Sequence, residues 1–210
     1  MTDEQKETLK FYTTNDYLLI NGLLWGVDDQ TLDTLIHIIN EDGLCVMKEA
    51  RELGFDVRWG CTMEEGERIY KVYQKRFPVI DSETVKKQII ARAQNDISNM
   101  MACLEPLTTD LILYRNIKTK FLDNIAEGKS LRYLGFSSCS LSPHIAENAT
   151  YGSSGCTLVE ISVPTGTPAI RLDLMPDVQN EPDEVILPPM EFLITRIDRE
   201  RNTVYMAGGK

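Results

Sequence analysis

The sequence lacks the features that mark membrane and exported proteins. It has no apolar run near the roughly 20 residues that a membrane-spanning helix needs. Its first residues, MTDEQKETLK, are polar and acidic, and they do not follow the basic-then-apolar order of a secretory signal. We therefore expect a cytoplasmic protein that has no membrane segment.

Paired cysteines are missing as well. The 210 residues include five cysteines, which are widely spaced and odd in number, and no two of them form a CxxC pair. This spacing argues against both a zinc site and a disulfide framework. We expect reduced thiols and no metal site.

Positive charge is scarce in this chain. The sequence has 22 lysines and arginines against 32 aspartates and glutamates, which gives a formal net charge of -10. A surface of this sign repels DNA and anionic lipid. The charge therefore favours a protein or small-molecule partner, with no nucleic acid and no membrane.

The hydrophobic pattern changes once, near residue 106. Before this point, apolar residues recur at the spacing of one helix face. They predict helices over about 15–24, 31–40, 44–53, 64–76 and 85–100.

After Pro106 the pattern is that of short strands separated by Gly, Pro, Asn or Asp. The predicted strands are Leu111 to Asn116, Tyr133 to Ser137, Thr157 to Val163, Glu184 to Leu187, Phe192 to Ile197 and Thr203 to Met206. Helices followed by strands are typical of an α+β fold. We predict a single domain, residues 1–210, in which a helical part (1–106) packs on a mainly antiparallel β-sandwich (107–210), with an active cleft between them.

Three polar patches stand out in the strand-rich half. In the strand LILYRNI, alternation places Leu111, Leu113 and Arg115 on one face. A guanidinium there suits phosphate or carboxylate, although an arginine at a strand end can also simply reach water. The second patch is the hydroxyl-rich run 135–142, GFSSCSLS, and the third is the acidic turn 181–184, EPDE, which leads into an apolar strand.

In this order, the patches resemble the arginine, serine-threonine-serine and glutamate motifs of the ADP-ribosyltransferase exoenzyme family. This family includes the clostridial Rho-modifying exoenzymes and the enzymatic subunits of binary toxins. The opening segment is also similar to the family's first conserved helix, through Phe11-Tyr12-Thr13, Tyr17, Ile20-Asn21 and Leu24. The resemblance covers about residues 9–197.

The resemblance implies an enzyme that splits NAD, as its substrate, and passes ADP-ribose to a protein side chain. Glu184 would be the essential acid, Ser138 would brace the cleft beside it, and Arg115 would hold a phosphate or ribose of NAD. The implied catalytic residues are Arg115, Ser138, Glu181 and Glu184, and the implied NAD-binding residues are Asn21, Arg115, Ser138, Ser140, Tyr151 and Glu184.

Two residues depart from the family pattern, and the role of a third is open. Pro182 occupies the place of a second acid or glutamine. The acceptor is therefore activated by Glu181, by Asp183 or by the substrate itself, or it is not activated by any group. Cys139 replaces the threonine of the serine motif, a change between small residues. Tyr151 is either the aromatic of a loop over nicotinamide or an ordinary loop residue.

These departures leave alternative functions open. The missing acid at Pro182 makes an NAD glycohydrolase, in which water takes the place of the acceptor, the second candidate after transfer to a protein. A catalytically inactive member that serves as a binding module is a third alternative, of a different class. We expect a monomer that acts in the cytoplasm or is delivered into a target cell as an effector, from a bacterial or phage source.

Overall fold

The computed structural model describes residues 1–36, 83–122, 124–148, 155–178 and 183–208. The chain divides into two compact units, Thr2–Met100 and Met101–Lys210, and Met1 groups with the second. The first unit holds the described helices of the N-terminal half, and the second holds all nine strands of the described chain.

The first unit opens with three consecutive helical segments. Helix α1 (Asp3–Phe11) begins with a capping box, in which Thr2 Oγ1 accepts a hydrogen bond from Gln5 N at 3.2 Å and Gln5 Oε1 accepts one from Thr2 N at 2.8 Å. A π-helical turn, η1 (Tyr12–Asp16), follows. Helix α2 (Tyr17–Trp25) then ends at Gly26, whose φ of 66° is the left-handed conformation that suits glycine.

The helical predictions are largely confirmed. Helix α2 covers 17–24 of the predicted 15–24, and η1 covers the first two residues; a helix over 29–36 covers the described part of 31–40, and α5 (Glu83–Ala102) covers 85–100. Their apolar faces share one core, which includes Leu19, Ile36 and Ile89. The predictions for 44–53 and 64–76 lie outside the described residues.

The second unit is built on one hydrogen-bonded sheet of nine strands. The strands are β1 (Glu105–Pro106), β2 (Leu111–Lys118), β3 (Ser130–Tyr133), β4 (Ser137–Ser140), β5 (Cys156–Val163), β6 (Pro168–Arg171), β7 (Glu184–Leu187), β8 (Met190–Asp198) and β9 (Thr203–Gly208). Short 3-10 helices, η2 (Thr119–Leu122) and η3 (Leu172–Leu174), follow β2 and β6, and α6 (Pro143–Asn148) follows β4. The spatial order is β1-β6-β7-β4-β2-β5-β9-β8-β3, and every pair is antiparallel except β5 with β9.

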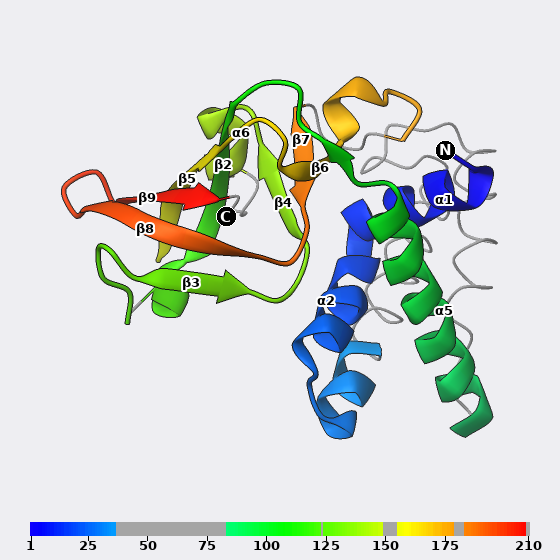
Figure 1. Ribbon diagram of the computed structural model, residues 1–210. Coiled ribbons are helices and arrows are strands. Elements are labelled where there is room, and N and C mark those ends of the chain that lie inside the picture. The colour runs from blue at the N-terminus through cyan, green and yellow to red at the C-terminus, as the bar shows by residue number, and fades with distance from the viewer. Residues whose placement is uncertain (37–82, 123, 149–154, 179–182, 209–210) are drawn as a thin grey trace, which may run out of the picture. The chain divides into compact units, whose positions relative to one another are not determined.

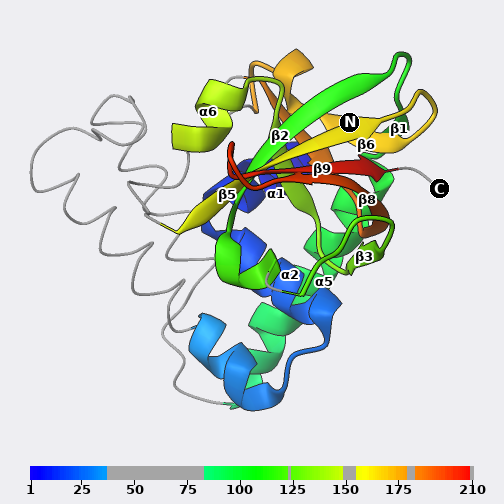
Figure 2. The same cartoon turned by 90° about the vertical axis from the view of Figure 1, so that its left-hand side faces the viewer.

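The sheet curls around its own core. Figure 1 shows β3, β8 and β9 running across the direction of β2, β4 and β7. Buried residues from both parts, among them Leu113, Val185, Phe192 and Met206, belong to one hydrophobic cluster. In Figure 2, β2, β5 and β9 lie side by side and α6 lies beside β2. The α+β class and the mainly antiparallel sheet are confirmed.

One strand prediction is wrong. The run Tyr133 to Ser137 is not a strand, because β3 ends at Tyr133 and β4 begins at Ser137. Strand β3 lies at one end of the strand order and β4 lies between β7 and β2, so the short segment between them passes from one part of the curled sheet to the other. The sequence pattern also missed α1, α6, β1 and β6, all of which have fewer than ten residues.

Candidate active site

Three neighbouring strands carry the three sequence motifs. Strand β4 pairs with β7 over four residues and places Ser140 opposite Glu184. Strand β2 pairs with β4 at a single position, where Tyr114, the neighbour of Arg115, lies opposite Ser140. Segments that are far apart in the sequence therefore meet in the middle of the sheet.

The serine and glutamate motifs are joined by a direct hydrogen bond. Ser138 Oγ donates to Glu184 Oε1 at 2.5 Å. Glu184 is only 6% exposed, whereas Ser138 is exposed. A buried carboxylate needs such donors to remain charged, so this bond both orients the acid and offsets its loss of water.

The backbone fixes the start of β7. Asp183 has a φ of 62°, in the left-handed region, and its carbonyl accepts a hydrogen bond from Leu141 N at 2.9 Å. The four residues of β7 are all buried. Glu184 is thus held by the turn before it, by the β4 register and by the buried strand that follows.

Cys139 lies between the two serines and close to both charged groups of the motifs. Burial raises the pKa of its thiol to about 11; the positive charge of Arg115 opposes this rise, and the negative charge of Glu184 adds to it. The thiol is therefore neutral near pH 7 and packs as a small apolar group. Cys139 is buried in the main hydrophobic cluster of the sheet, as expected for a small residue that stands in place of threonine.

Arg115 makes its described contacts with a residue that the sequence analysis did not single out. Its Nη2 donates to Tyr133 Oη at 3.3 Å, and its guanidinium carbon lies 5.2 Å from the centre of the Tyr133 ring. Strand alternation places Arg115 with Leu113, as expected, on the face that carries the core. Tyr133 was missed because its only sequence signal is its position shortly before the serine motif.

Ser140 organises the turn that follows β4. It is 7% exposed, and its Oγ accepts a hydrogen bond from Ser142 N at 3.0 Å. Ser142 Oγ in turn accepts from Ile145 N at 3.4 Å, within the first turn of α6. The described role of Ser140 is therefore to shape the chain beside Glu184.

The described structure does not test the placement of the remaining predicted residues. Asn21 is buried in α2, within the other unit, so its place relative to Glu184 stays a prediction. Tyr151, Glu181 and Pro182 lie outside the described residues. The segment similar to the family's first helix is divided into the end of α1, the π-helical turn and α2.

The described part of the chain has neither a metal-binding cluster nor a membrane-spanning helix. No cluster of three or more His, Cys, Asp or Glu residues there could hold a metal ion. None of the helices in the same ranges combines the length and the apolar character needed to cross a bilayer.

Solved structures similar to this chain include toxins that are ADP-ribosyltransferases. The Vis toxin of Vibrio splendidus is 17% identical, with 99% of this chain and 72% of the toxin covered and a TM-score of 0.48. The C3 exoenzyme of Clostridium limosum is 15% identical, with 100% of this chain and 87% of the exoenzyme covered and a TM-score of 0.49. Plx2a of Paenibacillus larvae is 15% identical, with 100% of this chain and 88% of Plx2a covered and a TM-score of 0.45. No protein-family model and no curated protein matches the chain. The family that the sequence motifs resemble is thus also found among solved structures similar to this chain.

Proposed function

We propose that this chain is a mono-ADP-ribosyltransferase, which cleaves NAD at the bond between nicotinamide and ribose and transfers ADP-ribose to a protein side chain. The observation that carries the proposal is the hydrogen bond from Ser138 Oγ to Glu184 Oε1 at 2.5 Å. It links two motifs that lie 46 residues apart and leaves a buried, oriented carboxylate beside an exposed hydroxyl.

The reaction needs a carboxylate of this kind. The bond between ribose C1′ and the nicotinamide nitrogen breaks, and its electron pair leaves with nicotinamide. Positive charge then develops on C1′ and the ring oxygen. Glu184, hydrogen-bonded to the ribose 2′-hydroxyl, would stabilise this charge mainly in the transition state. A nucleophile of the acceptor bonds to C1′ and gives its proton to a base or to water.

Other residues of the chain would bind and orient NAD. Arg115 suits a phosphate oxygen because its guanidinium is always charged and presents several donors in a plane. Tyr133 holds that guanidinium through its hydroxyl and its ring. We assign Asn21, Ser140 and Tyr151 to the NAD site as well, on the family resemblance.

The acceptor step is the basis of a second candidate function. Pro182 has no polar side chain, so Glu181 is our choice for activating the acceptor. If Glu181 does not do so, water takes the place of the acceptor and the chain is an NAD glycohydrolase. An inactive binding module would retain the fold and cleave no NAD.

One experiment separates these functions. Purified protein is incubated with NAD that carries a label on its adenine, with and without cell lysate, and both nicotinamide and labelled protein are measured. Transfer gives a labelled protein band and release stimulated by lysate. Hydrolysis gives release without a band. If neither nicotinamide nor labelled protein forms in either condition, an enzymatic role is contradicted.

The proposal extends to the setting in which the enzyme works. We propose one functional domain over residues 1–210, a monomer, with NAD and an acceptor protein as partners. The net charge of -10 supports a protein acceptor over nucleic acid or an anionic membrane. We propose that the enzyme acts in the cytoplasm, either where it is made or in a target cell that receives it as an effector.

A further inference from the structure

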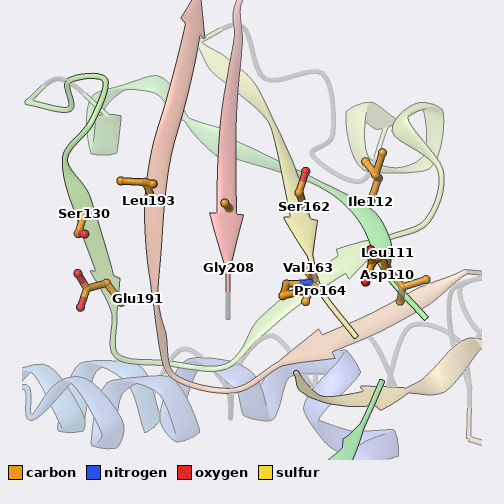
Figure 3. Close-up of a pocket in the computed structure, with 11 residues that line it drawn as sticks. Asp110, Leu111, Ile112, Ser130, Ser162, Val163, Pro164, Glu191, Leu193 and Gly208 are labelled. Atoms are coloured by element: carbon orange, nitrogen blue, oxygen red, sulfur yellow. The ribbon is translucent and has the colours of Figure 1, made fainter. Parts of the chain in front are cut away.

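A groove of about 910 Å³ lies on the strand unit, and none of its lining residues belongs to the proposed active site. It is formed where β2 begins, where β5 and β9 end, and along the first half of β8. Figure 3 shows its side chains spread across several strands rather than converging on one point. This form suits an extended segment better than a small compact molecule.

The strand register explains why the surface is hollow here. Ile112 lies opposite Ser162, Ser162 opposite Ala207, and Ala207 opposite Leu193. Two small residues in the middle are therefore flanked by two large apolar ones. Ile112 is 50% exposed and Leu193 is 39% exposed, so both walls offer apolar surface to a ligand.

The charged groups that line the groove are all acidic. Asp110 and Glu191 stand on opposite sides of it, and the lining residues include no lysine, arginine or histidine. Hydrogen bonds from Thr165 N and Oγ1, at 2.7 and 2.8 Å, lower the pKa of Asp110 and keep it ionised near neutral pH. Arg132 lies opposite Glu191 in the β3–β8 register and screens that side in part.

We infer that this groove binds a protein segment in which a short apolar run is flanked on both sides by lysine or arginine. The apolar side chains lie over Ser162 and Ala207, between Ile112 and Leu193, and the cations face Asp110 and Glu191. A second copy of this chain does not complement the groove, because its net charge is -10. This binding goes beyond the proposed NAD chemistry and does not depend on it.

The test measures binding of a short fluorescent peptide in which two leucines are flanked on both sides by lysine, by anisotropy at low salt. Leu193→Ser removes one apolar wall, and we expect roughly tenfold weaker binding. Leu174→Ser is the matched control, because Leu174 is 67% exposed and lies outside the groove. It should bind as the wild type does. Equal affinities of the two variants would overturn the proposal.

The charges are tested separately. Asp110→Asn and Glu191→Gln should each weaken binding about twofold to fivefold, and the difference should vanish at high salt. Glu200→Gln, an exposed acid outside the groove, is the control. The same peptide with glutamate in place of lysine should not bind. If it binds as well as the lysine peptide, the charge argument is wrong.

Two further readouts distinguish this proposal from other outcomes. Sedimentation without peptide should give a monomer, whereas a dimer that Leu193→Ser disrupts would show that a second copy occupies the groove and would overturn the proposal. Nicotinamide release from NAD should be unchanged in Leu193→Ser. Absence of release in the wild type would contradict the proposed function and leave the peptide result unaffected.

Discussion

At the scale of single residues, Glu184 depends on the hydroxyl of Ser138. The hydroxyl donates to a carboxylate that is only 6% exposed. Hydrogen bonds to charged groups contribute about 1.5–3 kcal/mol. We predict that Ser138→Ala lowers the rate of nicotinamide release roughly 10- to 100-fold. Ser98→Ala, on exposed helix surface, is the control; equal rates for both variants would show that the bond has no catalytic role.

Tyr133 is predicted to position Arg115. Tyr133→Phe removes the hydroxyl that accepts from Arg115 Nη2 and retains the ring. Because Arg115 is proposed to bind NAD before and during the reaction, we expect KM for NAD to rise about threefold to tenfold with kcat nearly unchanged. The control is Tyr205→Phe, whose ring lies 3.7 Å from the guanidinium carbon of Arg196. A fall in kcat at constant KM would contradict this role.

The buried thiol of Cys139 predicts a loss of stability in alkali. Its pKa is 9.0 when unfolded and about 11 in the folded chain, so the unfolded thiol loses its proton first. The contribution of the neutral thiol to the free energy of unfolding is fully present below pH 9. It is lost as the pH rises towards 11, which lowers the free energy of unfolding by up to about 3 kcal/mol. Unfolding by urea across this range should show a steeper decline for the wild type than for Cys139→Ala. Parallel declines would contradict the prediction.

At the scale of elements, β7 starts from a backbone conformation that few residues adopt. Asp183 has a φ of 62°, which asparagine and glycine tolerate and valine does not. We predict that Asp183→Asn is nearly neutral, whereas Asp183→Val lowers the free energy of unfolding by about 1–2 kcal/mol and displaces Glu184. Urea unfolding and nicotinamide release measure the two effects. A stable, active valine variant would show that the turn does not position the acid.

Elements whose own sequence carries a clear pattern could be predicted, and the others could not. Helix α5 and strands β2 and β7 match their predictions because their apolar spacing is regular. The predicted strand Tyr133 to Ser137 instead spans the end of β3 and the start of β4, because its aromatic and apolar residues outweighed the turn signal of Gly135. The separation of these two strands depends on which neighbours each strand pairs with, and a local pattern does not contain that information.

At the scale of the whole molecule, the sequence predicted which polar residues form the candidate site better than it predicted which of them contact one another. The motif order predicted that Ser138 and Glu184 belong together, and the β4–β7 register brings them into contact. The contact between Arg115 and Tyr133 could not be predicted, since it joins β2 to a strand at the far end of the sheet order. The groove could not be predicted either, because its walls come from β2 and β8.

We propose Glu184 as the acid of an NAD-cleaving enzyme, and the variant Glu184→Gln is the test of that role. Glutamine retains the oxygen that accepts from Ser138 and removes the charge. NAD binding and nicotinamide release are measured for this variant, for the wild type and for Glu105→Gln, an exposed acid in β1. We predict that Glu184→Gln still binds NAD but releases nicotinamide about 10²–10³ times more slowly, while Glu105→Gln matches the wild type. Equal release by all three proteins, or no release by the wild type, would contradict this role of Glu184.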